Sequence, residues 1–174
     1  MNTENKTDDA PKICLALDGF VQNLGHFFMW TNGLLIFGII AQVVLRYGFG
    51  HGLVALEELQ WHLYAVGIMF GASYAVTMNS HIRVDIVHAS LSEKWRARWD
   101  LFGIFFLLIP FTVIIFHQSL DFVWEAWRLN ERSDAPSGLP WRWAIKSVIP
   151  LSFGLLGISV VSRAIRLIDY IRRG

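Results

Sequence analysis

The sequence has few charged residues, and they are unevenly distributed along the chain. Only 17% of the 174 residues are Asp, Glu, Lys or Arg, whereas a soluble domain usually contains about a quarter. Four long stretches contain none of these residues: 19–45, 59–82, 101–120 and 147–162. A helix needs about 20 mostly apolar residues to cross a hydrocarbon core about 30 Å thick. The first three stretches reach this length, and the fourth does so if Lys146 and Arg163 extend their charges to the interface.

Cysteines and enzyme motifs are also scarce. The single cysteine, Cys14, excludes an internal disulfide and any zinc site built from several cysteines. The sequence contains no phosphate-binding glycine loop, no nucleophile with its base and no helical pair of metal-binding histidines. A net charge of +1 without a basic stripe argues against a nucleic-acid partner. We therefore predict no catalytic site, no metal and no cofactor.

The charge-free stretches predict an all-α integral membrane protein with four transmembrane helices. The expected spans cover about residues 20–45, 53–78, 97–128 and 143–166. They form a transmembrane domain over 20–168, between an N-terminal tail (1–19) and a C-terminal tail (169–174). Pro110 lies within the third span, where its missing N–H predicts a kink.

The segments between the spans have different compositions. Residues 46–52 are rich in glycine and predict a tight turn. The charged segment 79–96 has an apolar side, which predicts a short interfacial helix. Pro136, Gly138 and Pro140 predict an ordered loop over 129–141.

The distribution of Lys and Arg predicts the orientation in the membrane. The N-terminus, the 79–98 connector and the C-terminus together hold ten of these residues, and the opposite side holds five. Because basic residues are enriched on the cytoplasmic side, both termini and the connector are expected there.

A few polar residues are candidates for a structural or functional role. Glu57 and Glu58 open the second span, where free N–H groups and the positive end of the helix dipole favour carboxylates. Arg46 closes the first span across the turn. The favoured interpretation is a helix cap with an ion pair that staples this hairpin. Ion coupling and contact with a partner subunit are the alternatives.

Small residues recur along the second span. Gly67, Gly71 and Ala75 follow one another at four-residue spacing, and small residues allow two helices to approach closely in a membrane. We therefore expect this face to pack against a helix.

Two histidines support an alternative function. His62 and His117 lie at similar expected depths in the second and third spans. Such a pair can hold a haem, as in membrane anchor subunits of respiratory enzymes. Histidines hydrogen-bonded within or at the edge of the bundle are the favoured interpretation. A small channel that acts alone is a further alternative.

Several short motifs, taken in their order, resemble one transporter family. They are Arg46-Tyr47, Glu57-Glu58, His81-Ile82-Arg83-Val84-Asp85, Gly138-Leu139-Pro140-Trp141 and the stretch from Lys146 to Pro150. In order and spacing they resemble the small membrane subunit of tripartite ATP-independent periplasmic (TRAP) transporters, over residues 20–168.

The resemblance implies a non-catalytic subunit in the inner membrane of a bacterium. In such transporters, a periplasmic binding protein delivers a small organic acid to a large membrane subunit, which imports it with sodium. The small subunit braces the large one and helps to dock the binding protein.

The resemblance also implies roles for individual residues. His81, Arg83 and Asp85 would shape the cytoplasmic connector. Four charged residues of the periplasmic loop would contact the binding protein: Arg128, Glu131, Arg132 and Asp134.

Overall fold

The computed structural model describes residues 11–78 and 92–173, and every regular element within these ranges is helical. The elements are α1 (Lys12–Gly48), α2 (Val54–Thr77), α4 (Glu93–Gly103), the π-helical segment η2 (Ile104–Leu108), α5 (Ile109–Arg128), α6 (Arg142–Lys146) and α7 (Val148–Arg173). The all-helical prediction is confirmed for these residues. The predicted connector helix, with His81, Arg83 and Asp85, lies outside them.

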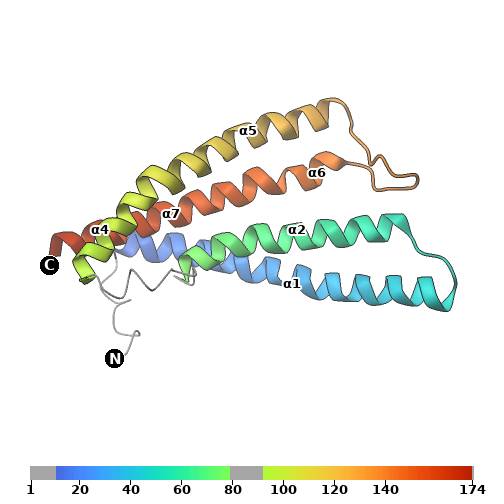
Figure 1. Cartoon of the computed structure of the whole chain (residues 1–174), viewed down its shortest axis with the longest axis horizontal. Coiled ribbons are helices and arrows are strands. Elements are labelled where there is room, and N and C mark those ends of the chain that lie inside the picture. Colours follow the sequence, from blue (N-terminus) through green and yellow to red (C-terminus); the bar gives the residue numbers. More distant parts are fainter. Residues whose placement is uncertain (1–10, 79–91, 174) are drawn as a thin grey trace.

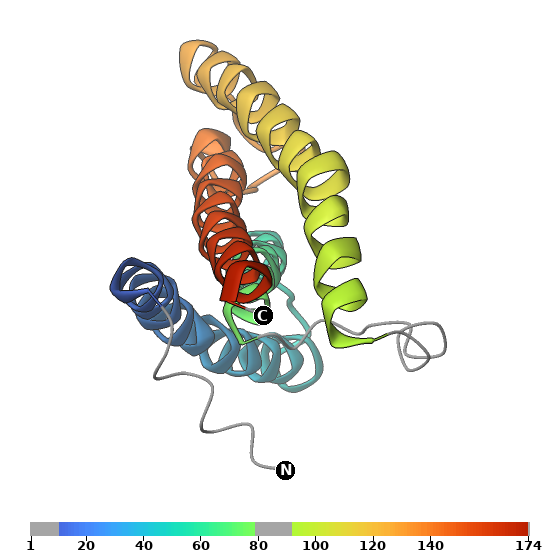
Figure 2. The same ribbon diagram turned by 90° about the vertical axis from the view of Figure 1, so that its left-hand side faces the viewer.

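The helices form two antiparallel hairpins, and α7 of the second hairpin packs against the first. One hairpin is α1 with α2, and the other runs from α4 through η2 and α5 to α6 and α7 (Figure 1). Helix α7 packs against α1, α2, α4 and α5 and is therefore the central helix (Figure 2). The start of α1 and the end of α7 lie at one end of the molecule, called here the terminal end. The turn after α1 and loop 129–141 lie at the other, the loop end (Figure 1).

Three helical segments are long and apolar enough to cross a membrane. They are Lys12–Gly48, Trp95–Arg128 and Arg142–Arg172. The 24 residues of α2 also give a length of about 36 Å at 1.5 Å per residue. Its first three turns, however, contain Glu57, Glu58 and His62, which make α2 less apolar. The second predicted span (53–78), and with it the count of four, therefore stays a prediction.

Helix α1 begins at Lys12, so residues 12–19 of the predicted N-terminal tail are helical. Contacts with α7 explain this early start. The side chain of Cys14 is buried, and its Sγ donates to the Ser162 carbonyl at 3.6 Å. One turn later, Asp18 is buried and accepts a hydrogen bond from Arg166. These tertiary contacts stabilise two helical turns that the sequence assigns to the N-terminal tail.

The third predicted span contains a π-helical segment directly before Pro110. The N–H of Ile109 donates to the carbonyl of Ile104, five residues earlier. Pro110 lacks an N–H, and its ring crowds the carbonyl of the preceding turn. The wider π-helical turn relieves this crowding, and the helix bends between α4 and α5 (Figure 1).

Hydroxyl groups and small side chains fill the contact between α7 and the first hairpin. Ser73, Ser159 and Ser162 are almost completely buried. Ser73 Oγ donates to the Ser152 carbonyl at 3.0 Å, and Ser159 Oγ donates to the Ser73 carbonyl at 3.3 Å. Small residues let the backbones approach closely, and side-chain hydrogen bonds then join the helices.

Candidate functional site at the loop end

Loop 129–141 is folded back on itself by backbone hydrogen bonds. The N–H of Glu131 donates to the Ala126 carbonyl at 3.0 Å, which closes the end of α5. The Glu131 carbonyl accepts from the N–H of Arg142 at 3.1 Å, where α6 begins. Further along, the N–H of Ser133 donates to the Leu139 carbonyl at 3.3 Å. The two arms of the loop therefore lie side by side, and residues 134–138 form its tip.

The carboxylate of Glu58, in the first turns of α2, binds both arms of this loop. One oxygen accepts a hydrogen bond from the Ser133 hydroxyl. The other accepts one from the N–H of Leu139 at 2.6 Å. Hydrogen bonds to an ionised carboxylate are among the stronger ones in proteins. Glu58 therefore fastens the loop after α5 to the start of α2.

Gly138 leaves the space that this contact needs. A Cβ atom at this position would lie 2.5 Å from Cβ of Ser133 and 2.9 Å from Oε1 of Glu58. Both distances are too short for real atoms, so any larger residue would push the loop away from α2. Glu58, Ser133, Gly138 and Leu139 are called here the Glu58 cluster.

Glu57, although adjacent to Glu58, binds a different part of the molecule. Its carboxylate accepts from Nε2 of Gln42 on α1 at 3.0 Å. The Oε1 of Gln42 in turn accepts from the N–H of Leu53 at 3.3 Å. Glu57 therefore supports the first hairpin, whereas Glu58 supports the loop of the second.

The ion pair that was predicted between Arg46 and these glutamates is not formed within the described residues. Arg46 is exposed in the last turn of α1, where the helix dipole favours a cation. Both carboxylates already have other hydrogen-bond donors. The hairpin is held at this point by Gln42, which is not among the residues predicted from the sequence.

The four charged residues predicted to contact a binding protein differ in their surroundings. Glu131 is half-buried, pairs with Lys146 and lies 3.8 Å from Arg142. Arg128 pairs with Glu125 of the same helix at 2.8 Å. Asp134 lies 3.2 Å from Arg142, yet 96% of its side chain is exposed. Arg132 is also exposed. The exposed charges of the loop itself are therefore Arg132 and Asp134.

The small residues of α2 also separate into two kinds. A Cβ atom at Gly67 would lie 3.0 Å from Oδ1 of Asn32, so Gly67 is closely packed against α1. A Cβ atom at Gly71 would meet nothing within 4 Å. Ala75 is partly buried. Within the described residues, the predicted packing face is therefore closely filled at Gly67 and open at Gly71.

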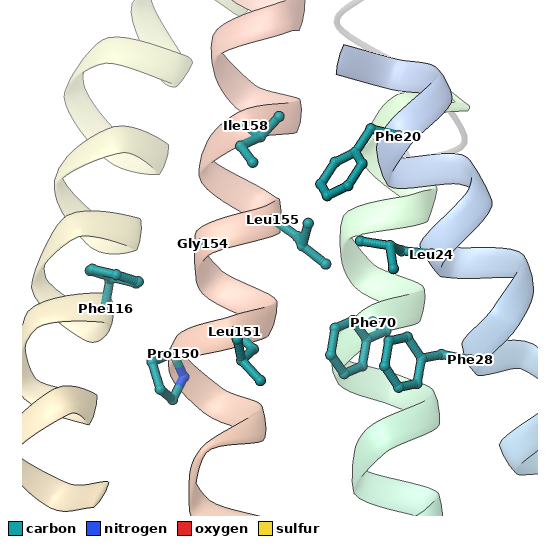
Figure 3. Close-up of a pocket in the computed structure, with 10 residues that line it drawn as sticks. All are labelled: Phe20, Leu24, Phe28, Phe70, Phe116, Pro150, Leu151, Gly154, Leu155 and Ile158. Atoms are coloured by element: carbon teal, nitrogen blue, oxygen red, sulfur yellow. The ribbon is translucent and has the colours of Figure 1, made fainter. Parts of the chain in front are cut away.

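An apolar groove lies between the first hairpin, α7 and α5 (Figure 3). It has a volume of about 440 Å³, and four of its ten lining residues are phenylalanines: Phe20, Phe28, Phe70 and Phe116. Phe28 and Phe70 are stacked, with their ring centroids 3.7 Å apart. All ten lining residues are apolar or glycine, so this groove suits hydrocarbon and offers no side-chain ligand for a carboxylate or a cation.

The two histidines of the haem alternative lie on different sides of α7. His62 is half-buried on α2, and His117 is exposed on α5. Helix α7 packs against both of these helices (Figure 2). In residues 11–78 and 92–173, no group of three His, Cys, Asp or Glu side chains is placed to hold a metal ion. The described geometry, with α7 between the helices that carry His62 and His117, gives the haem alternative no support.

Comparisons with known proteins identify one family. Residues 35–169 match the family described as tripartite ATP-independent periplasmic transporters, DctQ component. The chain is also 28% identical over 163 residues to a protein of Haemophilus influenzae named as a TRAP transporter small permease protein. The match covers 88% of this chain and 98% of that protein. No solved structure matches the chain significantly.

Proposed function

This chain belongs to the DctQ component family of TRAP transporters, and from this premise we propose how it works within such a transporter. It braces the large membrane subunit that transports the substrate. It also helps to dock the periplasmic binding protein that delivers a small organic acid for sodium-driven uptake. The substrate and the sodium ions bind in the other subunits.

In the proposed arrangement, all four long helical segments cross the inner membrane of a bacterium. Both termini lie in the cytoplasm, and loop 129–141 lies in the periplasm. Two observations support this orientation. The start of α1 and the end of α7 share one end of the molecule (Figure 1). In addition, the segments assigned to that side hold ten of the fifteen Lys and Arg residues, as expected for the cytoplasmic side.

The observation that carries the bracing role is the large apolar surface of the helices. On α1 the side chains of Phe27, Trp30 and Phe37 are about 70% exposed or more. On the helix through η2, Phe106 and Leu107 are similarly exposed. A surface of this kind fits lipid or the helices of another membrane subunit. Helix α7 contacts every other long helix, and these contacts make the chain a stable unit to which such a partner can bind.

The loop carries the proposed docking surface, which includes Arg128, Glu131, Arg132 and Asp134. Arg132 and Asp134 are exposed and available to a partner, whereas Glu131 is bound to Lys146 and supports the loop from within. Reversal of the charge in Arg132→Glu should weaken the dependence of uptake on the binding protein. If uptake and its dependence on the binding protein stay unchanged, Arg132 is not a contact.

A pull-down in mild detergent tests the proposed function as a whole. Tagged protein is extracted from native membranes, and the bound proteins are identified by mass spectrometry. We expect one large polytopic partner in stoichiometric amount and no Soret absorbance of haem. Recovery of the chain alone would contradict the proposal and would favour a channel that acts by itself. A Soret band that disappears in His62→Ala would favour the haem anchor.

A further inference from the structure

We propose that Glu58 is a positioning residue for the docking of the periplasmic binding protein. It holds loop 129–141 in the conformation that presents Arg132 and Asp134 to the periplasm. This inference rests on the proposed function, and it adds a residue of α2 that lies outside the docking loop. Glu58 acts through the loop and does not itself touch the binding protein.

The first argument is the reach of the Glu58 carboxylate. Its partners Ser133 and Leu139 lie 75 and 81 residues further along the chain, and they belong to opposite arms of the loop. One side chain therefore joins both arms to a helix of the other hairpin. Its hydrogen bonds involve an ionised acceptor, so each contributes more than a neutral hydrogen bond does.

The second argument is the backbone of the loop, which needs such support. Asn130, Ser137 and Trp141 have φ angles of 45°, 65° and 62°. Residues other than glycine rarely adopt this left-handed region, and they keep it only where surrounding contacts hold them. Gly138 follows Ser137 and is packed directly against Ser133 and Glu58. The Glu58 cluster supplies the contacts that hold this part of the loop.

The third argument is the alternation of side chains around the anchored residue. Ser133 points toward Glu58, while its neighbours Arg132 and Asp134 are exposed. Ser133 is the residue that joins these two charges along the backbone. Fixing Ser133 therefore fixes the side on which Arg132 and Asp134 are presented. Without this bond, the two charges lose their common orientation.

Glu57 provides a matched control for the test. It is the adjacent residue, has the same side chain and accepts a hydrogen bond from Gln42 of the first hairpin. The change Glu57→Ala removes the same number of atoms and the same charge from the same helix end. It leaves the bonds to Ser133 and Leu139 in place. A difference between the two alanine variants therefore reports the loop contact and not the local charge.

The experiment measures binding of the periplasmic protein to the membrane complex. The chain and its large partner are placed together in phospholipid nanodiscs. The purified binding protein of the same transporter is labelled with a fluorophore, and its Kd is measured by anisotropy. We expect Glu58→Ala to raise this Kd about tenfold, as the loss of charge-assisted hydrogen bonds would. Glu57→Ala should change it by no more than about twofold. Glu58→Gln should restore part of the affinity, because its amide oxygen still accepts from Leu139.

Two further measurements separate positioning from a general structural effect. Hydrogen exchange of the 129–141 peptide should be faster in Glu58→Ala and unchanged in Glu57→Ala. Recovery of the large partner with the chain should be equal in both variants. If Glu58→Ala fails to assemble, Ser133→Ala provides the second variant, because it removes one of the same bonds from the loop side. It should raise the Kd in the same direction.

The outcomes distinguish this inference from the proposed function. If the wild-type complex does not bind the labelled protein, the proposed docking role is wrong, and this inference falls with it. If the wild-type complex binds and Glu58→Ala has the same Kd as Glu57→Ala, the proposed function stands and the positioning role of Glu58 is refuted. The role of Glu58 is also refuted if hydrogen exchange of the loop is the same in both variants.

Discussion

At the terminal end of the molecule, α7 is joined to its neighbours by pairs of opposite charges. Arg166 pairs with Asp18 of α1, and Arg163 lies 3.2 Å from Asp100 of α4. At the loop end, the carboxylate of Glu58 instead binds a hydroxyl and a backbone N–H of a loop. The terminal end thus joins helix to helix, and its contacts set the fold. The loop end joins a helix to an exposed loop, so its contacts set the shape of a surface.

This comparison predicts the largest loss of stability at the terminal end. The Asp18 side chain is 10% exposed in its pair with Arg166, which is 33% exposed. Removing one partner of a buried pair typically costs about 3–5 kcal/mol. Because Arg166 is partly accessible to solvent, we expect about 2–3 kcal/mol for Asp18→Ala. Unfolding by dodecyl sulfate in mixed micelles measures this change. A loss as small as that of an exposed pair would show that α7 is not fixed by its charges.

A smaller loss is expected for Gly138→Ala at the loop end. The added Cβ would lie 2.5 Å from Cβ of Ser133, and overpacking of this kind costs about 1–3 kcal/mol. Because the clash concerns a loop, movement of the loop relieves part of it. We therefore expect less loss of stability than in Asp18→Ala, together with faster hydrogen exchange of residues 129–141. Unchanged exchange would mean that the contact between Glu58 and the loop tolerates the methyl group.

Two glycines of α2, away from both ends of the molecule, test how close packing changes the effect of an added methyl group on stability. Gly67 is closely packed against Asn32, whereas Gly71 faces open space. Alanine is favoured over glycine within a helix by up to about 1 kcal/mol. Gly71→Ala should therefore stabilise the isolated chain slightly, while in Gly67→Ala the contact with Asn32 offsets this gain. Equal effects, measured by thermal unfolding in detergent, would contradict the difference in packing.

The sequence predicted the helices and the loop because both follow from local patterns. Charge-free stretches predict long apolar helices, and Pro136, Gly138 and Pro140 predict the break between α5 and α6. The partners of Glu58 could not be predicted in this way, since Ser133 and Leu139 are far from it in sequence. Ion pairing with the nearby Arg46 was the simpler expectation, and the structure replaces it with two hydrogen bonds.

The terminal end was less predictable for a related physical reason. Asp18 lies just before a charge-free stretch, so the local sequence predicts that it belongs to a solvated tail. Its burial depends on Arg166, which is 148 residues away. The serines of α7 are similarly unremarkable in sequence. Only the packing of α7 against α2 shows that Ser159 joins the two helices through the Ser73 carbonyl.

The smallest effect on stability is expected for Asp134→Asn, at the tip of the loop. Asp134 lies 3.2 Å from Arg142, but 96% of its side chain is exposed. Exposed ion pairs contribute about 0–1 kcal/mol, since water and salt screen the attraction. The melting temperature of the complex in detergent should therefore fall by no more than about 2–4 °C, which is the shift that a loss of 1 kcal/mol produces in a chain of this size. If Asp134 contacts the binding protein, the same change should alter the salt dependence of that binding. If Asp134→Asn leaves stability unchanged and alters binding, the surface of loop 129–141 that Glu58 positions serves binding and not folding. A large loss of stability would instead make Asp134 part of the fold, and the difference between the two ends would disappear.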